Sequence, residues 1–93
     1  MAQATVLAAG TAAATSSDIV VAAGESVTVA IFAASGRLPT SVAFAVKQDT
    51  PGGDNVVARL TNVDRATVLA GPGTYRVQRP AYAGTAFGVF TET

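Results

Sequence analysis

From residue 18 onward, the sequence consists of short runs rich in Val, Thr and Ile that turn-forming residues interrupt about every ten positions. Such β-branched residues favour strands, and strands at this spacing are typical of a sandwich or a small barrel. No segment has the length and periodicity of a stable helix. The sequence therefore predicts an all-β fold, a single antiparallel β-sandwich of about seven strands, over residues 18–22, 26–33, 40–48, 55–61, 66–70, 74–79 and 84–91.

Alternation within these strands predicts which side chains form the core. In the 26–33 strand, Val27, Val29 and Ile31 occupy one face, and the other face is partly covered. The same period of two selects one row in each remaining strand. The predicted core is Val27, Val29, Ile31, Val42, Phe44, Val46, Leu60, Val68, Tyr75, Val77 and Phe90.

The turns between the strands contain Pro and Gly in characteristic combinations. Residues 49–54 place a proline before two glycines, which predicts a tight reversal, and Gly71-Pro72-Gly73 predicts a second corner. Tyr75 directly follows this corner and is similar to the tyrosine corner of Greek-key sandwiches, which favours an Ig-like, Greek-key topology. The alternative is a half-buried aromatic with its hydroxyl at the rim. Gly84 and Gly88 predict a bulge or the close approach of another backbone.

The first fifteen residues differ from the rest because they are small, almost uncharged and without a clear period. We expect residues 1–15 to form an extended arm that a neighbouring molecule orders, and residues 16–93 to form the sandwich domain. The alternative is a flexible chain end. No run is long and apolar enough for a membrane span, and the opening segment lacks the basic region of a secretory signal, so we expect synthesis in the cytoplasm.

The residue types present exclude most catalytic and metal sites. The 93 residues include no histidine and no cysteine, which removes the usual general base, the thiolate nucleophile and most zinc ligands. Asp49, Asp54 and Asn55 share one loop, but their spacing matches no calcium loop. The acidic residues fall in predicted turns or at strand ends, where they are solvated. We therefore expect neither an enzyme nor a cofactor.

The charge content suggests a protein partner. Only 13% of the residues are charged and the net charge is zero, which argues against nucleic acid and against an anionic membrane. A surface so poor in charge is typical of a protein that contacts another protein, although a neutral surface of Thr, Ser and Ala is an equal alternative. Arginines near tyrosines are enriched at interfaces. The candidate partner-contact residues are Ala2, Thr5, Val6, Leu7, Arg37, Leu38, Arg59, Arg76 and Tyr82.

Three stretches resemble small structural proteins of tailed bacteriophages: TSSDIVVAAGESVTV at residues 15–29, GPGTYRVQRP at 71–80 and GVFTET at 88–93. The resemblance implies a virion component, a head decoration or cement protein that binds the outside of the capsid. Its partner would be the major capsid protein, together with self-association on the capsid lattice. A surface module that recognises a glycan or a host protein is the alternative. The 49–54 loop has no aromatic residue, which favours the structural role.

Overall fold

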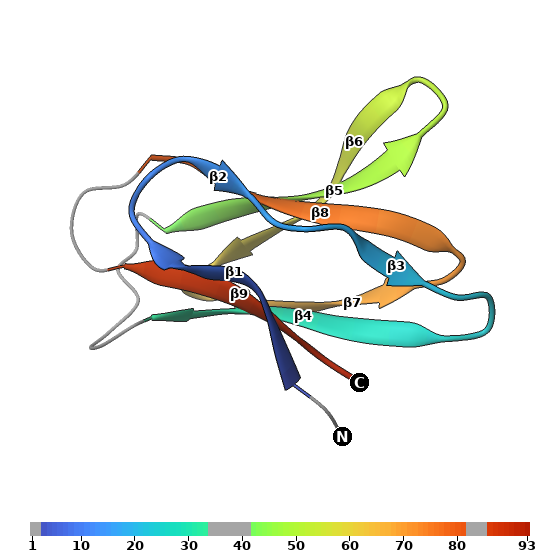
Figure 1. The fold of residues 1–93 in the computed structure, drawn as a ribbon, viewed down its shortest axis with the longest axis horizontal. Helices are drawn as coiled ribbons and strands as arrows, with labels where there is room; N and C mark the ends of the chain where they lie inside the picture. Colours follow the sequence, from blue (N-terminus) through green and yellow to red (C-terminus); the bar gives the residue numbers. More distant parts are fainter. Residues whose placement is uncertain (1–2, 34–41, 82–85) are drawn as a thin grey trace.

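The computed structural model describes residues 3–33, 42–81 and 86–93. All regular structure in these ranges is β-strand. The described residues contain no helix that could cross a membrane. Figure 1 shows the strands in two layers. The nine strands in the described ranges are β1 (Gln3–Gly10), β2 (Ala14–Thr15), β3 (Ile19–Val21), β4 (Ser26–Ala33), β5 (Ala43–Thr50), β6 (Gly53–Thr61), β7 (Ala66–Ala70), β8 (Gly73–Arg79) and β9 (Phe87–Glu92).

The strands form two antiparallel sheets, so the predicted all-β, two-sheet architecture is confirmed. Sheet A has the strand order β1-β9-β4-β7, and sheet B has the order β2-β8-β5-β6. The short strand β3 also pairs with β8, next to β2 along the same edge. The seven strands expected from the sequence all appear at or near their predicted positions, and β1 and β2 are additional.

The pairing of the strands is nested. β1 pairs with β9, β2 and β3 pair with β8, β4 pairs with β7, and β5 pairs with β6. Successive pairs alternate between the two sheets, which is the connectivity of a jelly roll. An Ig-like sandwich would place β8 and β9 side by side in one sheet. Here they lie in different sheets, so the Ig-like arrangement is not the one observed.

The core lies between the sheets and contains most of the predicted inward residues. The assignment of Val68 to the core is wrong, because Val68 is 63% exposed and its neighbour Leu69 is buried instead. Phe90 is half-buried outside the core, and Phe87 and Val89 are buried instead. β7 and β9 both have apolar residues on each of their two faces, so alternation alone does not show which face points into the core. Val27 is only partly buried against the core. The predicted residues that are buried are Val29, Ile31, Val42, Phe44, Val46, Leu60, Tyr75 and Val77.

The expected N-terminal arm is a strand of the protein's own sheet, which corrects the assignment of residues 1–15. β1 pairs with β9 from Gln3 opposite Glu92 to Gly10 opposite Phe87, and Leu7 is 8% exposed in the core. The backbone of β1 approaches β9 closely, since a Cβ on Gly88 would lie 2.6 Å from the carbonyl oxygen of Leu7. The predicted close approach at Gly88 is therefore confirmed. Gly84 lies outside the described residues.

The two predicted turns are present. Pro51 and Gly52 connect β5 and β6, and both strands extend further into the 49–54 loop than expected. At the second corner, the Tyr75 hydroxyl donates a hydrogen bond of 2.7 Å to the carbonyl of Ala70, as in a tyrosine corner. Gly71 is required at this corner, because a Cβ there would lie 1.9 Å from the carbonyl oxygen of Ala22.

Candidate partner-binding surface

The outer face of sheet A is almost free of charge. Of the residues in β1, β4, β7 and β9, only Glu92 is charged, and it accepts a hydrogen bond of 2.9 Å from the Gln3 side chain. Phe32 on β4 and Phe90 on β9 are half-buried, with ring centroids 6.1 Å apart and ring planes at 53°. Val68 on β7 is exposed on the same sheet. This face can bury apolar area against a partner, and Glu92 is the one charge among these strands whose removal from water would oppose it.

A shallow groove crosses the edge of this face. It has a volume of about 410 Å³ and is lined by Gln3, Ala4, Thr5, Phe32 and Phe90. The ring of Phe32 lies over Gly88, since a Cβ on Gly88 would come within 2.6 Å of that ring. Two aromatic walls and an open side suit an apolar side chain of a partner.

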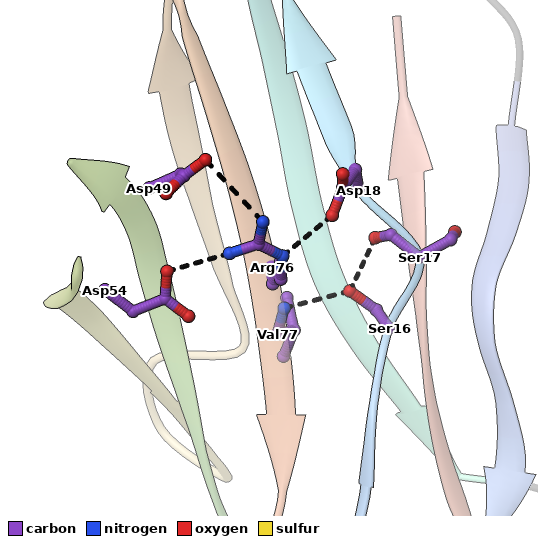
Figure 2. A network of polar contacts seen from close by, with 7 residues as sticks. All are labelled: Ser16, Ser17, Asp18, Asp49, Asp54, Arg76 and Val77. Atoms are coloured by element: carbon purple, nitrogen blue, oxygen red, sulfur yellow. Dashed lines mark hydrogen bonds and ion pairs between the residues drawn. The ribbon is translucent and has the colours of Figure 1, made fainter. Parts of the chain in front are cut away.

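The outer face of sheet B is organised around Arg76 on β8 (Figure 2). Its Nε lies 2.7 Å from Asp18 and its Nη1 lies 2.8 Å from Asp54. The third carboxylate, that of Asp49, is 3.7 Å from Nη2. The hydrogen bond and charge of Asp18, and then the charge of Asp54, raise the pKa of the Arg76 guanidinium above its ordinary value. Arg76 therefore joins β3, β8 and the β5–β6 hairpin, and its donors are used within the molecule.

Next to this network, Ser16 bridges the gap between β2 and β3. Its backbone N–H donates to the carbonyl of Val77 at 2.8 Å, and its hydroxyl oxygen accepts a hydrogen bond from the Val77 N–H at 2.9 Å. The hydroxyl also donates to the carbonyl of Ser17 (Figure 2). Ser16 thus continues the edge of sheet B across the interruption.

The predicted partner-contact residues do not gather in one place. Thr5 is exposed in the groove of sheet A, whereas Leu7 lies in the core and Val6 packs partly against it. Arg59 on β6 is exposed and lines a second groove, of about 330 Å³, beside Pro80. Arg76 is held by the carboxylates described above. Four of the predicted residues lie outside the described part of the chain: Ala2, Arg37, Leu38 and Tyr82.

Sequence reasoning missed the residues that make up the apolar face. The sequence predicted a partly covered second face for the 26–33 strand, and Phe32 lies on that face, but Phe90 and Val68 were assigned to the core. The available signal was the scarcity of charge in four separate segments, where Glu92 is the one charged residue, and only the strand pairing brings those segments together.

Within the described ranges, no group of three or more Asp or Glu side chains could hold a metal ion. Comparisons with protein-family models, curated proteins and solved structures find no match to this chain.

Proposed function

We propose that this protein is a non-enzymatic structural component of a phage virion, which binds the outside of the capsid and bridges neighbouring major capsid subunits. The observation that supports this proposal is the almost uncharged outer face of sheet A, with Phe32, Phe90 and the exposed Val68. The phage setting comes from the sequence resemblance at residues 15–29, 71–80 and 88–93. Jelly rolls are found in viral capsid domains, which agrees with this setting.

The binding energy in this proposal comes from apolar burial. Covering two aromatic rings and a valine removes apolar area from water, at about 25 cal/mol per Å². A protein that binds only the assembled shell shifts the equilibrium towards assembly, and that is how a cement protein stabilises a capsid. Long-range attraction contributes little, because the chain has no net charge.

A second candidate is a surface module that recognises a glycan or a host protein. The observation that favours it is the groove beside Phe32 and Phe90, in which Gln3 and Thr5 supply polar groups next to aromatic rings. Jelly rolls also occur among lectins. Binding to glycans or host-cell extracts, with none to capsids, would select this candidate.

The proposal is tested by measuring occupancy on purified full particles and on DNA-free shells across a salt series. We expect binding to both, with a shallow dependence on salt. Contact with DNA phosphates would instead lose about 10³–10⁵ in affinity between low and moderate salt. Release at moderate salt, or binding to naked DNA, would overturn the proposal.

A pair of variants locates the contact. Phe90→Ser removes one aromatic wall of the groove, and we expect it to weaken capsid binding by about ten-fold or more, as for a central interface residue. Val20→Ser is the matched control, because Val20 is 73% exposed on β3 of the other sheet. Equal binding of the two folded variants would show that sheet A does not dock.

A further inference from the structure

The described strands leave four sheet edges, and β7 is the least protected of them. Proteins usually guard an edge with charges, prolines, bulges or interruptions. β1 has two register shifts against β9, and β6 carries Asp54 and Arg59 and has an extra residue, Val57, in its pairing with β5. β2 and β3 are two short pieces on one edge. β7, with the sequence ATVLA, has no charge or proline, and its pairing with β4 is uninterrupted.

The hydrogen bonds at the two ends of β7 show which of its backbone groups face the open edge. The Ile31 N–H donates to the Arg65 carbonyl at 3.0 Å, and the Gly71 N–H donates to the Glu25 carbonyl at 3.0 Å. Hydrogen-bonded pairs alternate in an antiparallel ladder, so the odd-numbered residues between them bond to β4. The N–H and C=O groups of Ala66, Val68 and Ala70 therefore point to the open edge.

We propose that two copies of this protein pair through β7, antiparallel and about a two-fold axis at Val68. In this register Val68 lies opposite Val68 of the second copy, and Ala66 lies opposite Ala70. All three residues have outward backbone groups, so each of these pairs exchanges two main-chain hydrogen bonds. A symmetric interface of this kind needs a self-complementary strand, and β7 has that property.

The side chains and charges fit this register. The side chains of Ala66, Val68 and Ala70 are all exposed, so only Ala and Val side chains would lie next to the second copy. Arg65, which precedes β7, would lie opposite Gly71. The two Arg65 residues are then six residue positions apart, about 20 Å, which exceeds the screening length of about 8–10 Å. Pairing would extend the almost uncharged outer face of sheet A across both copies.

The interface is small, so the dimer should dissociate on dilution. A five-residue edge buries less than the roughly 1,200 Å² of a standard stable interface. Copies held side by side on a surface would pair more readily, because their effective concentration reaches about the millimolar range. The pairing itself does not depend on the identity of that surface.

The test uses purified full-length protein in sedimentation experiments over a concentration series. Wild type should show a monomer–dimer equilibrium. Val68→Lys and Val68→Asp each place like charges opposite one another, and we expect each to weaken dimerisation by about ten-fold or more. An equimolar mixture of the two should recover dimerisation, because Lys then lies opposite Asp. Val20→Lys makes the same change at an exposed site on sheet B and should dimerise like wild type.

A backbone variant provides a second measurement. Val68→Pro removes an N–H that points to the open edge and leaves the hydrogen bonds to β4 in place, so we expect a folded monomer. Circular dichroism checks the fold of every variant. The proposal is wrong if wild type stays monomeric at millimolar concentration, if the Lys and Asp variants dimerise as tightly as wild type, or if their mixture shows no recovery. Since no capsid is present, such a failure would leave the capsid proposal standing.

Discussion

At the scale of single residues, Arg79 on β8 joins the two sheets. It is 6% exposed, and it is the buried charged side chain of the described ranges. Its Nε donates to the Ala12 carbonyl at 2.8 Å, and its Nη1 donates to the carbonyls of Ala8 and Phe87 at 2.9 and 2.6 Å. These bonds connect β8 with β1, with the segment that follows β1, and with β9. Backbone carbonyls compensate the cost of burying this cation.

We expect Arg79→Met to lower the free energy of unfolding by about 2–4 kcal/mol, because a side chain of similar length then leaves buried carbonyls without donors. Arg59→Met is the control, because the Arg59 side chain is exposed; its effect should stay within about 0.5 kcal/mol. Urea denaturation monitored by circular dichroism measures both. Equal midpoints for the two variants would show that the Arg79 contacts contribute nothing.

At the scale of elements, β1 has a different role from the one its composition indicates. It covers the edge of β9 and contributes Leu7 to the core. The sequence predicted that residues 1–15 form an arm outside the sandwich domain. The strand pairing reverses this expectation, because without β1 the strand β9, which contributes Val89 to the core, would become an exposed edge.

Removing residues 1–10 should therefore prevent cooperative folding. Leu7→Ala should cost about 2–5 kcal/mol, the usual effect of truncating a buried leucine, whereas Thr5→Ala, on the exposed part of β1, should change little. Thermal unfolding followed by circular dichroism distinguishes these outcomes. A truncated chain that melts like the full-length protein would restore the interpretation of this segment as an arm.

At the scale of the whole molecule, nested pairing places the two ends of the chain together. Gln3 pairs with Glu92, and Figure 1 shows the start of β1 near the end of β9. A contact between residues far apart in the sequence forms only after a long loop has closed, which costs conformational entropy. Folds dominated by such non-local pairs therefore fold slowly. The single core between the sheets also favours one cooperative transition.

We expect folding in milliseconds to seconds, with one unfolding transition that is the same for secondary and tertiary probes. Stopped-flow circular dichroism and tyrosine fluorescence provide the two probes. Two separate transitions, or folding in microseconds, would contradict a fold in which the β1–β9 pair and the core form together.

Sequence alone determined the local features of this protein. Strand positions followed from β-branched runs, and the turns at Pro51-Gly52 and Gly71-Pro72-Gly73 followed from residues with special backbone properties. Where alternation is regular, as at Val42, Phe44 and Val46, the buried face was also correct. The absence of histidine and cysteine followed from composition.

Only the tertiary structure decided which strands pair and which apolar residues stay outside. The partner of β1, the separation of β8 from β9, and the exposure of Val68 beside a buried Leu69 all depend on residues far away in the sequence. A period of two defines two faces but does not say which one meets another sheet when both are apolar. The apolar outer face of sheet A and the open edge of β7 exist for the same reason, because strand order is set by long-range pairing and packing and not by local preference.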